Sequence, residues 1–260
     1  MNNSFIKDFW NNQGEKFKES HWASWGDIFM INLETELISK QIGESRYILD
    51  VGCANGFSAF KQLEANPKIK MIGVDFAEKM IDAATKELKE KYGHFQDRVQ
   101  FKAGDVCDLN FEDNSFDLAY TTRVLINLPD WELQKKGIDE MIRVVKKGGK
   151  VVLLEAFREP LNLLNAMRAL KSLPPLVEHD FNRYLEISNV DDYLSSLGIQ
   201  FKRIDFSSIY YLGSRFLREL VTDVNQYEGY SNPINEIFYN IEKEYSGGGF
   251  GIQQAYIIQK

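Results

Sequence analysis

The 260-residue sequence has little cysteine, little histidine and no long hydrophobic run. Its two cysteines, Cys53 and Cys107, are too few for a disulfide framework and lack the paired spacing of a zinc site, so both are expected to be reduced thiols. The three histidines are scattered, which predicts no metal bound by protein ligands. No apolar segment approaches the roughly 20 residues needed to cross a bilayer, and we expect no membrane insertion.

Clusters of basic residues and a secretion signal are missing as well. The net charge is −7, whereas nucleic-acid-binding proteins take much of their affinity from a basic surface, so we expect no nucleic-acid partner. The first ten residues include Asn, Lys, Asp and Trp instead of a basic start followed by an apolar stretch, which predicts a cytoplasmic location. The sequence does not predict an oligomeric state.

The central part of the sequence alternates short β-branched runs with longer amphipathic stretches. This alternation is typical of repeated β-α units, which build a parallel sheet. The expected strands are 47–51, 70–75, 99–103, 116–120 and 150–156. The expected helices are 56–65, 78–92 and 131–146. Lys146 and Lys147, followed by two glycines, predict the end of the last of these helices, with cations at its negative pole.

The sequence divides into four parts around this pattern. Residues 1–45 are aromatic-rich and predict an N-terminal helical cover, and residues 46–157 form the α/β core. Residues 158–187 are too long for a simple connection and predict a cap. Residues 188–260 complete the sheet and contain a second cap at about 210–250. In this last part a capping box at Ser188 opens a helix to Leu197, and strands are expected over 200–207 and 254–259.

Three strand ends carry small or acidic residues that suit an adenosine ligand. The run Tyr47–Gly56 places a strand before a tight turn of small residues, which lets backbone amides approach a ligand closely. Asp75 ends the second strand, where a ribose diol needs a carboxylate acceptor. Asp105 follows the third strand and suits the adenine amino group. Because parallel strands end at one edge of a sheet, these features predict one adenosine-sized crevice.

The glycine pattern separates two classes of adenosine-binding protein. A dinucleotide-binding fingerprint needs a third glycine where Phe57 stands, so NAD is disfavoured. The three motifs together resemble those of class I S-adenosylmethionine-dependent methyltransferases, although Ala54 replaces the glycine usual in that family. This resemblance implies an α/β fold with a Rossmann-like, doubly wound, seven-stranded sheet and helical cap insertions. It also implies S-adenosyl-L-methionine as the cofactor.

The same resemblance implies roles for individual residues. Asp50 would orient the turn or accept from the cofactor's ammonium group, Gly52 would admit its methionine moiety, and Asp75 would hold the ribose. Asp105 and Val106 would bind the adenine. The full expected set of cofactor contacts is Trp25, Asp50, Gly52, Ala54, Asn55, Asp75, Phe76, Met80, Asp105, Val106 and Thr121.

The segment after the fourth strand distinguishes acceptor classes. It lacks the [DNS]-P-P-[YF] motif of amino-directed methyltransferases and the acidic metal ligands of catechol-type enzymes. Residues 121–157 and the run Ala23–Asp27 resemble small-molecule methyltransferases associated with bacterial surface (capsule) polysaccharide. That narrower resemblance implies transfer to oxygen on a small polar acceptor, either a sugar or an anionic phosphate- or phosphoramidate-type precursor. Two alternatives are a lipid or quinone-like acceptor and a catalytically silent cofactor-binding subunit.

Several side chains are candidates for acceptor binding and catalysis. Arg123 follows the fourth strand, and its guanidinium suits an anionic acceptor beside the methyl group; a salt bridge to a neighbouring acid is the alternative. Glu155 lies at the functional end of a strand, and His179 is the candidate base in the cap. The remaining candidate acceptor contacts are His21, Asn182, Tyr184, Tyr210 and Tyr211.

Overall fold

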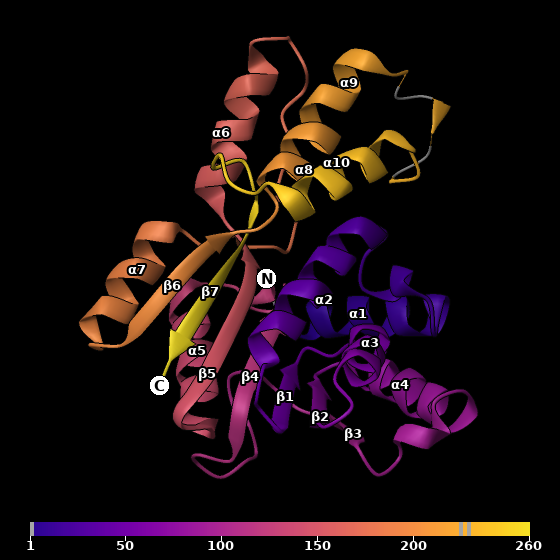
Figure 1. Ribbon diagram of the computed structural model, residues 1–260, viewed down its shortest axis with the longest axis vertical. Coiled ribbons are helices and arrows are strands. Elements are labelled where there is room, and N and C mark those ends of the chain that lie inside the picture. The colour runs from indigo at the N-terminus through magenta and orange to yellow at the C-terminus, as the bar shows by residue number, and fades with distance from the viewer. Residues whose placement is uncertain (1–2, 224–225, 228–229) are drawn as a thin grey trace.

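The computed structural model describes residues 3–223, 226–227 and 230–260, and it contains one seven-stranded sheet with helices on both faces (Figure 1). The strand order is β3-β2-β1-β4-β5-β7-β6. The strands are β1 (Tyr47–Val51), β2 (Lys70–Asp75), β3 (Val99–Ala103), β4 (Phe116–Thr122), β5 (Val145–Ala156), β6 (Gln200–Asp205) and β7 (Gln253–Gln259). The seven-stranded α/β fold predicted from the sequence is confirmed.

The register of the sheet brings three strand ends to one edge. Strands β1 to β5 pair in parallel, and Val51 of β1 lies opposite both Val74 of β2 and Thr121 of β4. Only β7 runs against its neighbours β5 and β6, which makes the sheet mixed. The residues that follow β1, β2 and β4 therefore meet at a common carboxyl edge.

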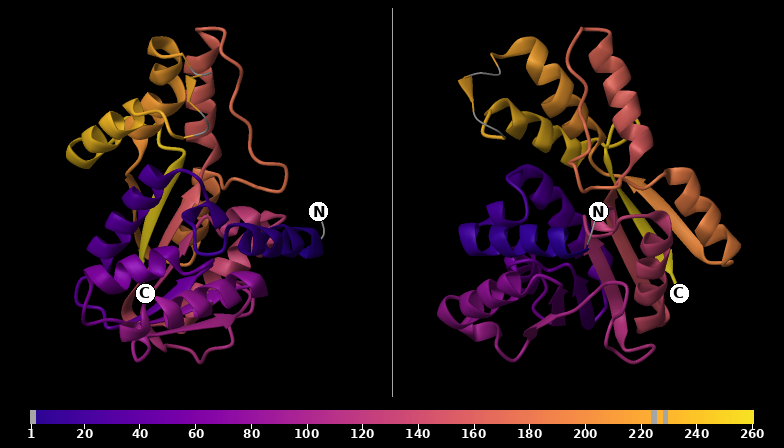
Figure 2. Two further views of the ribbon diagram at one scale, coloured as in Figure 1. Left: turned by 90° about the vertical axis from the view of Figure 1, so that its right-hand side faces the viewer. Right: turned by 180° about the vertical axis from the view of Figure 1, so that it is seen from behind.

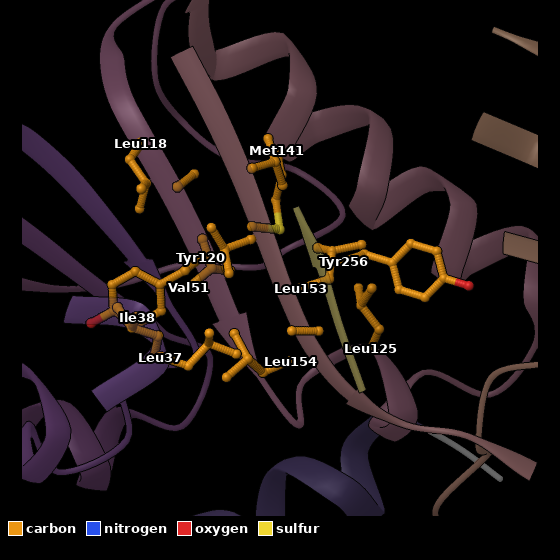
Figure 3. Packing of buried hydrophobic residues seen from close by; sticks show 14 of the residues in the cluster. Leu37, Ile38, Val51, Leu118, Tyr120, Leu125, Met141, Leu153, Leu154 and Tyr256 are labelled. Atoms are coloured by element: carbon orange, nitrogen blue, oxygen red, sulfur yellow. The ribbon is translucent and has the colours of Figure 1, made fainter. Parts of the chain in front are cut away.

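Helices cover the sheet in two layers (Figures 1 and 2). One layer contains α2 (Ile28–Ile42), α3 (Phe57–Ala65) and α4 (Glu78–Glu90), and the other contains α5 (Trp131–Val144) and α7 (Ile187–Ser196). Successive strand residues point to opposite faces, and so β5 contributes to both layers. In Figure 3, Leu154 of β5 lies near Leu37 of α2, whereas Leu153 lies near Met141 of α5.

A helical cap lies beyond the carboxyl edge of the sheet (Figure 2). It consists of α6 (Arg158–Ala169), α8 (Ser208–Leu212), a π-helix (Gly213–Leu217), α9 (Arg218–Val221) and α10 (Ile234–Glu244). Helix α1 (Asn3–Phe17) does not belong to this cap. It packs against α4, where Lys7 forms an ion pair of 3.1 Å with Glu78. The cap and α1 therefore face the carboxyl edge from two directions.

Several predicted helix ends differ from the structure by one or two residues, and two of them rested on a sequence signal that the structure does not follow. The helix expected to reach Lys146 ends at Val144, because Val145 is already extended and Lys146 pairs across the strands with Asp117 at 2.7 Å. The lysines and glycines that follow therefore lie in β5. The helix expected to start from a capping box at Ser188 begins at Ile187, after Glu186, and has no side-chain cap. It starts at that point because a backbone bridge between Phe157 and Leu185 fixes the preceding residues.

Candidate active site

A cavity of about 660 Å³ lies at the carboxyl edge of the sheet. Its floor is formed by residues after β1, β2, β3 and β4, and its walls come from α1, residues 176–184 and the cap. Such a crevice outside the carboxyl ends of parallel strands is where open α/β sheets bind ligands. Residues from all four predicted parts of the chain line this cavity.

The turn after β1 has the backbone geometry of a ligand-approach loop. Gly52, Ala54 and Gly56 have φ angles of 79°, 47° and 80°, all in the left-handed region. A side chain at Gly52 would place its Cβ 2.1 Å from Cγ2 of Val124, so glycine is required there. Ala54 carries the steric cost of a left-handed alanine, about 1–2 kcal/mol. The backbone N–H of Ala54 donates to Asp75 Oδ2 at 2.9 Å, which stabilises this conformation.

The side chain of Asp75 is suited to hold a diol. Its Oδ2 accepts from Ala54 and its Oδ1 accepts from the backbone N–H of Ala77, each at 2.9 Å. Burial raises its pKa to about 6, although these backbone hydrogen bonds lower it. Each oxygen retains acceptor capacity, and Asp75 lines the cavity.

The adenine end of the predicted site is also present. Asp105 lines the cavity, and its Oδ1 accepts from the backbone N–H of Cys107 at 2.8 Å. Phe76, Met80 and Val106 line the same cavity. A carboxylate pair with apolar neighbours at two adjacent strand ends fits the ribose and the flat base of S-adenosylmethionine.

Three predicted cofactor contacts lie behind the cavity wall. Asp50 is buried in β1, where burial raises its pKa to about 7 and a hydrogen bond from Tyr120 lowers it. Asn55 donates through Nδ2 to the carbonyls of Lys18 and Ser20, at 2.6 and 2.8 Å. It thereby ties the N-terminal cover to the glycine turn. Thr121 is buried as well.

Glu155, a predicted catalytic residue, is not at the cavity surface. Its side chain is fully buried and accepts from the Thr121 hydroxyl at 2.8 Å and from the backbone N–H groups of Val124, Leu125 and Ile126 at 3.1–3.3 Å. Burial raises its pKa to about 7, and these donors lower it. Glu155 therefore holds the turn that follows β4, and its catalytic role stays a prediction.

That turn carries Arg123, whose backbone is left-handed with φ 59°. The carbonyl of Arg123 accepts from Asn127 Nδ2 at 2.7 Å, which helps to hold this strained conformation. Its guanidinium lies 4.5 Å from the centre of the Trp25 ring, and Nε lies 3.3 Å from Oε1 of Glu34. Both Arg123 and Trp25 line the cavity. Arg123 thus combines the cavity position expected from the sequence with the salt bridge expected as its alternative.

The remaining candidates for acceptor binding and catalysis divide into two groups. His179, Asn182, Tyr184 and Tyr211 line the cavity. His179 also packs 4.4 Å from the ring of Phe181.

The other two acceptor candidates lie outside the cavity. Tyr210 is fully buried, and its hydroxyl donates to Asp27 at 2.6 Å. His21 packs 5.6 Å from the ring of Phe57 instead of facing the cavity.

Sequence reasoning missed a second arginine and two acids. Arg215, on the π-helix, lines the cavity, pairs with buried Asp27 and lies 4.7 Å over the ring of Tyr230. Glu34 forms an ion pair with Arg123, in which Oε1 lies 3.3 Å from Nε without a hydrogen bond. Asp27 is the N-cap of α2, and Glu34 lies seven residues further along the chain on the apolar face of that helix. Two acids at this spacing along an apolar helix face were the available signal.

The glycine turn, the carboxylates after β2 and β3 and the strand order define a class I S-adenosylmethionine-dependent methyltransferase. Residues 43–204 match the family described as "Methyltransferase domain", and the chain belongs to this family. Its cofactor is S-adenosyl-L-methionine. In the part of the chain that the structure describes, no helix is long and apolar enough to cross a membrane, and no three side chains are grouped to hold a metal.

Curated relatives are similar over part of the chain. Demethylmenaquinone methyltransferase from Lactobacillus johnsonii is 27% identical over 198 residues, which cover 72% of this chain and 69% of the relative. The protein of that name from Lactococcus lactis is 38% identical over 109 residues, which cover 42% of this chain and 41% of the relative. The chain thus spans less than half of the second relative. These names do not support the expected link to surface polysaccharide.

Solved structures show the same fold at low sequence identity. Geranyl diphosphate C-methyltransferase from Streptomyces coelicolor, with S-adenosyl-L-homocysteine bound, has a TM-score of 0.56 and 14% identity over 87% of this chain and 77% of that one. A methyltransferase from Thermotoga maritima, described as a possible histamine N-methyltransferase, has a TM-score of 0.55 and 19% identity over 88% and 89%. At these identities the likeness shows the fold alone.

Proposed function

We propose that this methyltransferase acts on an apolar ring compound that carries a hydroxyl or oxyanion group, that is, a quinol-like acceptor. The observation that carries the proposal is the position of Arg123 in the wall of a cavity that several aromatic and aliphatic side chains also line. The curated relatives named demethylmenaquinone methyltransferase support it, because that name denotes a quinone-type acceptor.

The acceptor side of the cavity has mostly apolar walls. Phe9 and Trp10 of α1, Leu161 of α6, and Leu176 and Tyr184 from the segment that follows all line the cavity. Burial of an aromatic ring against such side chains is favourable. A sugar would bring many hydroxyl groups into contact with them, and each unpaired hydroxyl would cost about 1–3 kcal/mol.

Charge near the cavity also favours one anionic oxygen over several. Arg123 and Arg215 both line the cavity, which would suit a polar, anionic acceptor such as a phosphorylated sugar. Each guanidinium, however, already has a buried carboxylate partner, Glu34 or Asp27. The two pairs reduce the net positive charge, so the site suits a single oxyanion better than a phosphate.

The residues of the chain position the reactants. S-adenosylmethionine, when bound, supplies a methyl group attached to a sulfonium. Asp75 and Asp105 would hold the adenosine portion. The glycine turn leaves room for the methionine moiety at the end of β1. Arg123 stabilises negative charge on the acceptor oxygen, which makes the acceptor a better nucleophile. The aromatic walls exclude water and limit the orientations of the ring.

The test uses 1,4-naphthoquinol, prepared by reduction of 1,4-naphthoquinone, as the acceptor. Formation of S-adenosylhomocysteine and a methylated product is expected, and the position of the methyl group in the product, on oxygen or carbon, is determined by NMR. Absence of turnover with naphthoquinol, combined with turnover of a nucleotide sugar, would overturn the proposal. Cofactor binding without turnover of any acceptor would indicate the catalytically silent alternative.

Arg123→Met tests the residue that carries the proposal. Because the variant keeps most of the side-chain length and removes the charge, kcat/KM for naphthoquinol should fall by about tenfold or more, roughly 1.4 kcal/mol. Affinity for S-adenosylhomocysteine and thermal stability should change little, since buried Glu34 can take up a proton. Arg46→Met, at an exposed ion pair, is the matched control. Lost stability with unchanged kcat/KM would assign Arg123 to the fold instead.

A further inference from the structure

Glu34 is a buried acid that the proposed reaction does not yet use. It lies on α2 behind the cavity wall, and its side chain is 3% exposed. Its Oε1 lies 3.3 Å from Nε of Arg123, but the geometry makes no hydrogen bond, and neither atom has another hydrogen-bond partner within the described residues. Gln253, which lines the cavity, hydrogen-bonds to Glu34. A carboxylate and a guanidinium thus face each other in an incomplete pair beside the acceptor site.

The groups around Glu34 have opposing effects on the pKa of its carboxyl group. Burial raises its pKa to about 7; Arg123 and the hydrogen bond from Gln253 lower it, and the charges of Asp27 and Glu155 raise it further. Tyr211 on α8 also faces it, with its own pKa raised by burial. A second negative charge at Arg123 would therefore shift Glu34 toward its protonated form.

We propose that Glu34 is a positioning residue that exchanges its place at Arg123 with the acceptor oxygen. In the empty cavity Glu34 is ionised and balances the guanidinium. When an acceptor oxyanion pairs with Arg123, Glu34 takes up a proton. That proton comes from the acceptor when a hydroxyl ionises in the cavity, and from water when the acceptor enters as an anion. The inference rests on the proposed function, because it requires an acceptor oxygen at Arg123.

The neighbouring buried acids are less suited to this exchange. Glu155 accepts four hydrogen bonds, from the Thr121 hydroxyl and three backbone N–H groups. Asp27 accepts from the guanidinium of Arg215, the Tyr210 hydroxyl and the backbone N–H of Met30. Of these three acids, only Glu34 has an oxygen that lacks a hydrogen-bond partner. It can change its proton occupancy without breaking a hydrogen bond at Oε1.

The experiment measures protons taken up on binding. 1-Hydroxy-2-naphthoate, whose carboxylate stays ionised, is titrated by calorimetry at pH 7.5 into protein saturated with S-adenosylhomocysteine, in two buffers of different ionisation heat. We expect the wild-type protein to take up roughly half a proton or more per ligand bound. Glu34→Gln should remove this uptake. Glu242→Gln should retain it, because Glu242 is a buried acid with a similarly raised pKa, to about 7, that hydrogen-bonds to α8 instead of facing Arg123.

A second measurement needs no variant. Because binding is coupled to proton uptake, the affinity of the wild-type protein for 1-hydroxy-2-naphthoate should fall as pH rises above about 7, by up to tenfold per pH unit. Uptake that persists in Glu34→Gln, or an affinity that does not depend on pH, would overturn the role of Glu34. Failure of the wild type both to bind the naphthoate and to methylate naphthoquinol would instead contradict the proposed function.

Discussion

Cofactor binding should depend on pH because of Asp75, whose carboxylate must be ionised to accept from the ribose but has a raised pKa. Its pKa is raised to about 6 by burial, while ribose hydroxyls donate only to acceptor oxygens and favour the ionised form. Affinity for S-adenosylhomocysteine should therefore rise as pH increases through about 6. Asp75→Ala should weaken binding by about 2–3 kcal/mol and remove that dependence, as measured by calorimetry.

Asp108→Ala is the matched control for this prediction, because Asp108 is an exposed acid in the segment that follows the neighbouring strand β3. It should bind S-adenosylhomocysteine like the wild type. A folded Asp75→Ala protein with unchanged affinity would place the ribose elsewhere.

The site residues that were predicted from the sequence depend on local features, whereas those that were missed form ion pairs with partners far away in the sequence. Asp75 and Asp105 were predictable because each directly follows its own strand, and strand ends share an edge. Arg123 was predictable for the same reason. Its partner Glu34 is 89 positions away, and Asp27 is 188 positions from Arg215. Such pairs depend on the packing of α2 against the cap, which no local pattern encodes.

At the scale of elements, α1 closes the cavity against the segment that follows α6. The ring of Phe9 lies 4.7 Å from that of Phe181 and 5.8 Å from that of His179. Aromatic pairs of this kind contribute about 0.5–1.5 kcal/mol each beyond their burial. Phe9→Ala should therefore weaken acceptor binding by roughly threefold to tenfold and accelerate hydrogen exchange over residues 170–187, with little effect on cofactor affinity.

Phe5→Ala on the same helix is the matched control, because Phe5 is 53% exposed and is not among the residues that line the cavity. It should leave exchange and acceptor affinity unchanged. Equal effects of both substitutions would indicate that α1 supports the fold and does not close the site.

The bounds of helices and strands were predicted correctly where a short apolar run is flanked by turn residues in the sequence. The bounds of β1, β2 and β3 agree with the expected strands residue by residue, since each is a short apolar run between turn signals. The prediction failed at the start of β5, where Val145 begins the strand and Lys146 pairs with Asp117. The cap segments were recognised by their length, but their individual helices were not predicted, because they are stabilised by contacts with one another and with α2. The division into four parts stays a prediction.

For the whole molecule, several buried acids make stability depend on pH in an unusual direction. Burial raises the pKa values of Asp50, Glu155 and Glu242 to about 7. Since their unfolded values lie near 4, the folded state binds more protons between these limits, and stability should fall as pH rises from about 5 to 7.5. Asp117 and Glu140 have lowered pKa values, so their contribution is present above about pH 4 and lost below it.

Thermal unfolding should show the result as a melting temperature a few degrees higher at pH 5.5 than at pH 7.5. The measurement is repeated at high salt, which screens exposed charges but not these buried groups. A melting temperature that increases steadily up to pH 7.5 would contradict the prediction.

The position of β7 has a consequence for how the polypeptide is assembled. This strand is synthesised after β6 but lies between β5 and β6, and within the described residues it supplies the only strand pairing that β6 makes. Until residues 253–259 leave the ribosome, β5 presents an open edge and β6 has no partner. A nascent chain stalled before this point should expose that edge to other β-strands. Translation speed over the final segment is therefore expected to influence how much of the protein aggregates.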